Sequence, residues 1–154
     1  MEKIISLLKE KNLTLASAES FTGGGFANEV TNYSGASNVF KGALVTYTNE
    51  IKENVLDVSI DTLEMHGAVS EQCCREMANN AKLLFNTDIA VSFTGNAGPN
   101  PSEDKEVGLV FIGFAYKNSI IVDKINYKGD RVSIKNQSIS YAINKICDII
   151  KKEF

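Results

Sequence analysis

Residues 13–30, LTLASAESFTGGGFANEV, contain the unit from which the rest of the chain can be placed. The apolar stretch 13–18 predicts a short strand, and the glycine run 23–25 predicts a sharp turn. A helical pattern over 26–30 follows the turn. A strand that leads through a turn into a helix is the repeating unit of an α/β fold.

Strands and helices alternate along the remainder of the chain. We expect further strands over 40–47, 88–93, 107–116 and 119–127, the last two joined as a hairpin at Lys117-Asn118. We expect helices over 4–8, after Thr48-Asn49, from a Ser70 cap to about Phe85, and from Arg131 to about Lys151. The fold class predicted is α/β, a three-layer α/β/α sandwich whose mixed, mostly parallel sheet contains the late hairpin.

The length and net charge of the chain exclude several classes of function. A chain of 154 residues fits a single domain, 1–154, and its formal net charge of −3 argues against nucleic-acid binding through bulk electrostatics. The N-terminal apolar run is too short and too charged for a signal peptide, and no stretch reaches membrane-spanning length. We therefore expect a cytoplasmic protein without membrane contact. Its three cysteines, Cys73, Cys74 and Cys147, lack metal-site spacing and are expected to be free thiols in helices.

Three polar loops should meet at one edge of the sheet. They span 19–25, 47–52 and 94–108, and each follows a predicted strand. In open α/β sheets, ligands bind at the carboxyl ends of the strands. This convergence predicts a site before any particular chemistry is assigned.

Ser20 and Lys52 are the candidates for that chemistry. A hydroxyl before a glycine-rich turn suits a nucleophile or an anion cradle, although serine also commonly caps such turns. The single histidine, His66, lies in a predicted helix end and offers no serine–histidine pair. Lysine can replace histidine as the base if burial lowers its pKa. The alternative for Lys52 is a solvated helix face, and spacing alone does not decide between the two.

Tyr47 and Arg131 flank the same loops. Tyr47 ends the second strand, where it either serves the site or packs in the core with its hydroxyl at the rim. Arg131 opens the last helix, where the helix dipole disfavours a cation. Its position therefore favours an anion or carboxylate partner over an exposed side chain.

Six sequence strings, taken together and in order, resemble the C-terminal domain family of the competence-damage-inducible protein CinA. They are Ala-Glu-Ser-Phe-Thr-Gly-Gly (18–24), Val-Thr-Tyr-Thr-Asn-Glu-Ile-Lys (45–52), His-Gly-Ala-Val-Ser-Glu (66–71), Thr-Gly-Asn-Ala-Gly-Pro (94–99), Val-Gly (107–108) and Gly-Asp-Arg (129–131). The resemblance implies an anticodon-binding-like α/β/α domain. It also implies hydrolysis of nicotinamide mononucleotide to nicotinic acid mononucleotide and ammonia, without cofactor or metal. The pyrophosphatase-type domain of larger members is not expected in this chain.

The resemblance also implies roles for the residues of this chain that match the family's motifs. The resemblance implies that Ser20 is the nucleophile, Lys52 the general base, and Tyr47 a proton relay or a group that positions Ser20. It implies that substrate-binding residues are Thr22, Gly23, Gly24, Thr94, Gly95 and Arg131. A backbone N–H near Thr22 or Gly23 is the expected oxyanion donor. The expected partners are a small nucleotide substrate and further copies of the chain in a homodimer or larger homo-oligomer.

The chain departs from the family pattern at four places. Phe21 replaces a usual cysteine, Asn96 a usual isoleucine and Glu106 a usual proline, and Asn100-Pro101 shortens a glycine-rich stretch. None of these changes removes a proposed catalytic group. They motivate two alternatives: a catalytically weakened nucleotide-binding or interaction module, and an amidase for another pyridine carboxamide.

Overall fold

The strand, turn and helix predicted from residues 13–30 form β1 (Leu15–Glu19) and α2 (Gly25–Thr31) in the computed structural model, which describes residues 1–154. The remaining strands are β2 (Phe40–Val45), β3 (Ile89–Gly95), β4 (Leu109–Tyr116) and β5 (Ser119–Asn126). The remaining helices are α1 (Glu2–Glu10), α3 (Asn49–Asn54), α4 (Ile60–His66), α5 (Glu71–Phe85) and α6 (Arg131–Glu153). A 3-10 turn at Ala36–Asn38 was not predicted.

The five strands form one mixed sheet in the order β2-β1-β3-β4-β5. β1 pairs in parallel with β2 and with β3. β4 pairs antiparallel with β3 and, through the β4–β5 hairpin, with β5. Four of the five strands therefore run in the same direction, and the predicted mixed sheet with its hairpin is confirmed.

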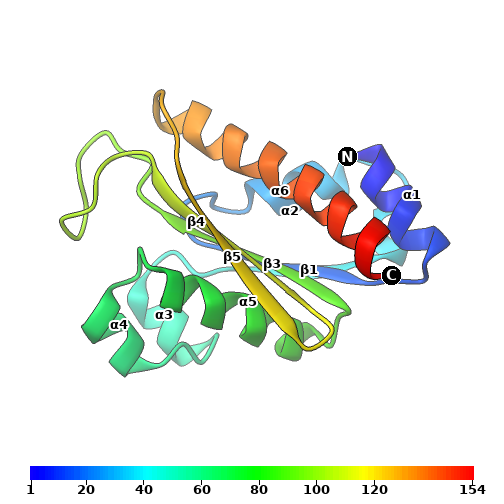
Figure 1. Ribbon diagram of the computed structural model, residues 1–154, viewed down its shortest axis with the longest axis horizontal. Helices are drawn as coiled ribbons and strands as arrows, with labels where there is room; N and C mark the ends of the chain where they lie inside the picture. Colours follow the sequence, from blue (N-terminus) through cyan, green and yellow to red (C-terminus); the bar gives the residue numbers. More distant parts are fainter.

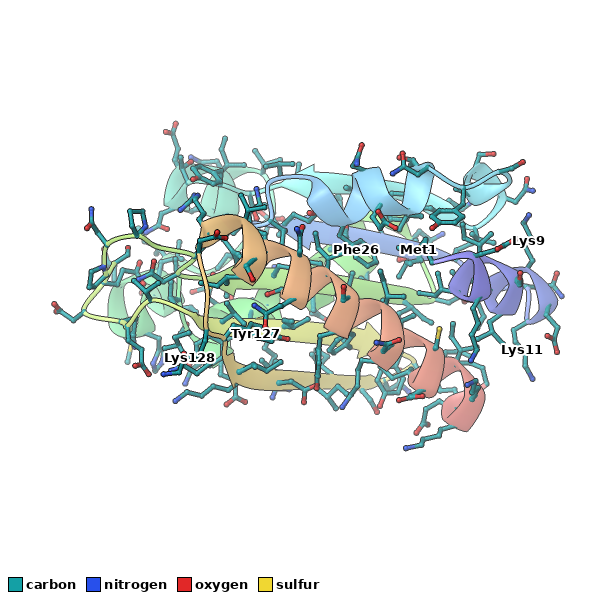
Figure 2. All side chains as sticks on the ribbon, turned by 90° about the horizontal axis from the view of Figure 1, so that it is seen from above. Met1, Lys9, Lys11, Phe26, Tyr127 and Lys128 are labelled. Atoms are coloured by element: carbon teal, nitrogen blue, oxygen red, sulfur yellow. The ribbon has the colours of Figure 1, made fainter.

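Helices cover both faces of this sheet (Figure 1). Figure 2 shows α1, α2 and α6 lying over the strands, with Phe26 at α2. Phe26 is fully buried in the main core cluster, where its ring lies 5.4 Å from that of Phe93 on β3. On the opposite face lie α3, α4 and α5, with Met77 of α5 packed beside Ala90 of β3 in a smaller cluster. The three-layer α/β/α prediction is thus confirmed.

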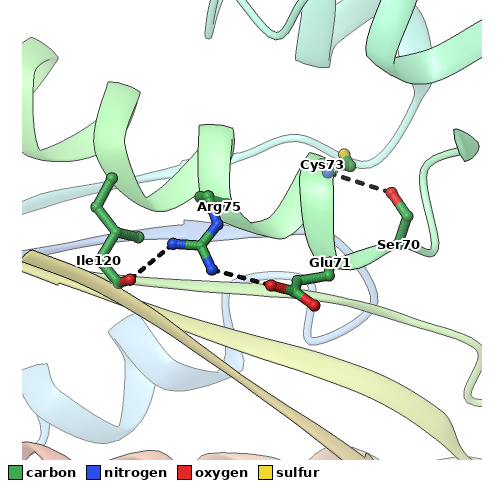
Figure 3. Close-up of polar contacts among 5 residues, drawn as sticks. All are labelled: Ser70, Glu71, Cys73, Arg75 and Ile120. Atoms are coloured by element: carbon green, nitrogen blue, oxygen red, sulfur yellow. Dashed lines mark hydrogen bonds and ion pairs between the residues drawn. The ribbon is translucent and has the colours of Figure 1, made fainter.

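Helix α5 begins at the predicted cap (Figure 3). The Ser70 hydroxyl oxygen accepts a hydrogen bond from the Cys73 N–H at 3.1 Å, which satisfies one of the free donors of the first turn. Arg75 donates to the Glu71 carboxylate and to the Ile120 carbonyl of β5. The cap thus begins α5 at Ser70, and the bridge joins the helix to β5.

The cysteine prediction is also confirmed. All three cysteines are free and buried, two of them on α5 and one on α6. None of the helices combines the length and the apolar character that crossing a membrane requires.

Candidate active site

Ser20 directly follows β1 and is 9% exposed. Its N–H donates to the Phe93 carbonyl at 2.9 Å, so the backbone stays aligned with β3 for one residue past the strand. The chain then turns through Gly23 and Gly24, whose φ values of 61° and 90° lie in the left-handed region. Glycine adopts this region without a steric cost. The turn leaves the Ser20 hydroxyl at the carboxyl edge of the sheet, as predicted.

Lys52 reaches the Ser20 hydroxyl from α3. The Thr48 hydroxyl accepts from the Ile51 N–H and caps this helix, which directs Lys52 inward, where it is only 1% exposed. Its Nζ lies 3.1 Å from Ser20 Oγ and donates to the Thr46 carbonyl at 2.8 Å. The predicted pair therefore comes together although 32 residues separate its members.

Burial lowers the pKa of Lys52 from its ordinary value of 10.5, because the ammonium form loses hydration. The Glu103 carboxylate opposes this shift, and so does Cys73 when its thiol is ionised. A neutral amine has two N–H donors and one lone pair. The Thr46 carbonyl can only accept, so it takes one N–H. The lone pair is then free to accept the Ser20 hydroxyl proton, which is the geometry of a nucleophile and its base.

Glu19 is a residue whose role the sequence did not reveal. Its side chain is fully buried, and its carboxylate accepts from the N–H groups of Phe26 at 3.0 Å and Ala27 at 2.9 Å. The Ser17 hydroxyl donates to it as well. The carboxylate thus caps α2 across the turn and fixes the loop that contains Ser20. The quoted Ala-Glu-Ser string contained this residue, but its capping partners lie seven and eight residues away.

Replacing Glu19 by glutamine should lower the free energy of unfolding by about 1–3 kcal/mol, because a glutamine amide cannot accept both N–H groups and leaves one buried donor unsatisfied. Urea unfolding measures this change. Glu10→Gln is the matched control, since Glu10 is exposed at the end of α1. Equal stability of both variants would show that the Glu19 cap contributes nothing to the fold.

Ser20 and Lys52 line a pocket of about 260 Å³. Its walls come from the three predicted loops, the connection between α4 and α5, and the start of α6. They comprise Ser20, Phe21, Tyr47, Asn49, Lys52, Ala68, Val69, Thr94, Gly95, Asn96, Ala97, Ser102, Glu103 and Arg131. The predicted convergence of loops 19–25, 47–52 and 94–108 therefore describes this pocket, except for the residues after Phe21.

The residues Thr22, Gly23 and Gly24 line a different hollow, between α2 and α6. The turn directs them away from the Ser20 pocket, so the structure does not bring them together with Lys52. The Gly23 N–H donates to the Ser20 carbonyl at 3.1 Å, which leaves the Thr22 N–H as the remaining candidate of the two for an oxyanion donor. Their contact with substrate stays a prediction.

Thr94 and Gly95 do line the pocket. The Thr94 hydroxyl donates to the Ala68 carbonyl at 2.6 Å and joins β3 to the α4–α5 connection. A side chain at Gly95 would come within 2.8 Å of the Val110 Cα, so only glycine fits beside β4. Both residues shape the wall; a direct contact with substrate stays a prediction.

Tyr47 and Arg131 meet each other at the mouth of the pocket. Tyr47 is 58% exposed, so the core-packing alternative is wrong, and no hydrogen bond joins its hydroxyl to Ser20. Arg131 donates to the Tyr47 hydroxyl at 3.0 Å and to the Gly98 carbonyl at 2.5 Å. Two of the five N–H donors of Arg131 are therefore bonded to neutral oxygen atoms. The roles of Tyr47 as relay and of Arg131 as anion ligand stay predictions.

Loop 96–108 is held by side chains of its own. Asn96 accepts from the Gly98 N–H at 3.0 Å and donates to the Lys105 carbonyl at 3.1 Å. Glu103 accepts from the Ala68 and Val69 N–H groups at 3.1 Å and 2.9 Å. No sequence spacing pointed to Glu103, because its partners lie 34 and 35 residues earlier.

His66 ends α4 and is exposed, as expected for a surface or capping histidine. It does not line the Ser20 pocket. The chain contains no group of three or more histidine, cysteine or acidic side chains that could hold a metal ion.

Comparison with known proteins agrees with this architecture. Residues 1–150 match the family model of the CinA C-terminal domain. A protein of Bacillus cytotoxicus named as a competence-damage inducible protein is 50% identical over 140 residues, which cover 90% of this chain and 34% of that protein. The chain thus spans about a third of the length of the curated relatives it matches.

Solved structures give the same result. The crystal structure of the competence damage-inducible protein A from Klebsiella pneumoniae superposes with a TM-score of 0.97 at 28% identity, covering 99% of this chain and 96% of that one. The competence/damage inducible protein CihA from Agrobacterium tumefaciens gives a TM-score of 0.92 at 33% identity, with coverages of 96% and 92%. By sequence and by structure, the chain belongs to the CinA C-terminal domain family.

Proposed function

We propose that this chain is an amidohydrolase that deamidates nicotinamide mononucleotide to nicotinic acid mononucleotide and ammonia. One observation carries the proposal: a buried lysine amine lies 3.1 Å from a serine hydroxyl in a pocket open to a small ligand. Burial lowers the pKa of this lysine, which favours the neutral form that a base requires. The family membership supports the choice of substrate.

The proposed reaction has two halves. In the first, Ser20 Oγ attacks the carboxamide carbon while its proton moves to Lys52 Nζ. The tetrahedral oxyanion collapses, the carbon–nitrogen bond breaks, and Lys52 returns the proton to the leaving ammonia. In the second half, water attacks the nicotinoyl-serine ester while Lys52 takes one of its protons. The bond between the acyl carbon and Ser20 Oγ then breaks, Lys52 returns the proton to Ser20 Oγ, and the acid product gives its remaining proton to ammonia and leaves as the carboxylate.

The positive charge of Arg131 suits the phosphate of a nucleotide. Arg131 lies at its mouth, and its guanidinium can exchange the neutral oxygens of Tyr47 and Gly98 for a phosphate, to which it binds more strongly. The volume of about 260 Å³ fits a ligand the size of a nicotinamide ring with part of its ribose inside the pocket. The phosphate would then lie toward solvent near Arg131.

The test is release of ammonia and of the pyridine carboxylate product by the purified chain. Nicotinamide mononucleotide, nicotinamide riboside and nicotinamide form the substrate series. Equimolar ammonia and carboxylate from the mononucleotide, with weaker turnover of the two compounds that lack phosphate, is the expected result. Faster turnover of another carboxamide would favour the alternative amidase, and binding of the mononucleotide without turnover would favour a binding module.

A further inference from the structure

Glu103 is the one acidic side chain that lines the Ser20–Lys52 pocket. The Ala68 and Val69 N–H groups each donate to one of its carboxylate oxygens. Gly67 makes room for this contact, because a Cβ at that position would lie 2.6 Å from Glu103 Oε2. Two separate features thus place this carboxylate against the α4–α5 connection at the pocket wall.

The turn that presents Glu103 has an uncommon backbone. Glu103 and Asp104 both have left-handed φ values, 53° and 56°, which residues other than glycine rarely adopt. The Ser102–Lys105 bridge closes the turn around them. A non-glycine backbone of this kind persists only where the surroundings hold it, and it is enriched at functional sites.

Lys52 lacks a close counter-charge. Its Nζ contacts a hydroxyl and a carbonyl, both neutral, and no carboxylate lies within the 4.0 Å of an ion pair. During the proposed reaction Lys52 takes the Ser20 proton, so a positive charge forms on a side chain that is almost fully buried. A buried charge of this kind is costly unless an opposite charge lies near it.

We propose that Glu103 supplies the negative charge that stabilises the ammonium form of Lys52 when it takes the proton of Ser20. This inference rests on the proposed function. Glu103 is a positioning residue in this scheme, because it acts through Lys52 and its carboxylate remains on the backbone N–H groups of Ala68 and Val69.

The other charged or titratable groups around Lys52 do not replace Glu103. Cys73 of α5 faces Lys52, but burial raises the pKa of its thiol to about 12, so it is neutral near pH 7. Arg131 lines the pocket with the opposite sign of charge, and Tyr47 lies at its mouth. The Glu103 carboxylate is therefore the negative charge that offsets the desolvation of Lys52.

The test removes the charge and follows the titration of Lys52. In Glu103→Gln, the pKa of Lys52 should fall further, by about one unit, which is the order of shift that an opposite charge produces. Two measurements report this change. One is the NMR titration of the lysine side-chain carbon signals, with Lys52 assigned through Lys52→Met, and the other is the acidic limb of kcat/KM against pH. Both should move to lower pH, and kcat above this limb should fall several-fold because the amine becomes a weaker base.

Asp104→Asn is the matched control. It removes the same charge from the next residue of the same turn. Both residues are exposed, but only Glu103 lines the pocket. Its Lys52 titration should equal that of the wild type. Glu103→Asp keeps the charge and should restore most of the wild-type titration, which distinguishes loss of charge from a loosened loop.

Two results would overturn the inference: a Lys52 titration in Glu103→Gln equal to that in Asp104→Asn, or a shift to higher pH. The NMR titration needs no substrate. Failure of the wild type to deamidate nicotinamide mononucleotide would therefore contradict the proposed function without deciding the role of Glu103. A wild type that turns over normally with an unmoved titration in Glu103→Gln would contradict this inference alone.

Discussion

Replacing Ser20 by alanine should lower kcat/KM for nicotinamide mononucleotide by at least about 10⁴-fold, because losses of this size follow removal of a nucleophile in covalent hydrolases. Lys52 stays in place in this variant and keeps its contact with the Thr46 carbonyl. The pocket keeps its walls, so the dissociation constant of the substrate should change little. Ammonia release measures the first quantity, and isothermal titration calorimetry measures the second.

Ser102→Ala is the matched control for this experiment. Ser102 also lines the pocket, but no hydrogen bond joins its hydroxyl to Lys52. Its variant should keep wild-type turnover within a few-fold. If Ser20→Ala retained near-normal turnover, the serine ester would not form and direct attack by water would have to replace it. A mass-spectrometric search for the nicotinoyl ester on Ser20 in the wild type decides between these mechanisms independently.

Features that depend on neighbouring residues could be predicted from the sequence. The β1–α2 unit follows from an apolar run, a glycine turn and a helical pattern, all within 18 residues. The Ser70 cap and the β4–β5 hairpin are local in the same way, and the structure contains both. The fold class follows from the alternation of these units, because strands and helices that alternate must form layers.

The pocket could be predicted only in outline. The rule that ligands lie at the carboxyl ends of strands predicted that Ser20 and Lys52 lie in one site, although their separation in the sequence matches no known motif. The rule did not show that Thr22, Gly23 and Gly24 of the same loop line a separate hollow between α2 and α6, because that placement depends on the packing of these two helices. Glu19 and Glu103 bind backbone N–H groups whose positions are set by tertiary structure, so their roles were not visible in the sequence.

Replacing Lys52 by methionine should lower kcat by about 10²–10⁴-fold, which is the usual contribution of a general base. Methionine keeps the length of the buried stem and removes the amine. The Ser20 hydroxyl then has no group to take its proton, whereas substrate contacts elsewhere in the pocket remain. The expected pattern is a lower kcat with a nearly unchanged KM, measured beside Lys41→Met, a control on an exposed lysine of β2.

The same variant should change how stability depends on pH. Burial lowers the pKa of Lys52 in the folded chain, while in the unfolded chain the amine keeps its ordinary value of 10.5. Between these two values the unfolded chain holds a proton that the folded chain has released, so wild-type stability rises with pH across this window. Lys52→Met has no amine to titrate at this position, so its stability lacks this dependence on pH.

The free energy of unfolding of the wild type minus that of Lys52→Met should therefore increase as the pH rises toward 10.5. Subtraction cancels the cysteine and tyrosine titrations that both proteins share, and urea unfolding at several pH values gives the difference. A difference that stays flat across this range would mean that the folded and unfolded chains hold the Lys52 proton equally. The amine would then be an ammonium at neutral pH, and the base of the proposed reaction would have to be another group.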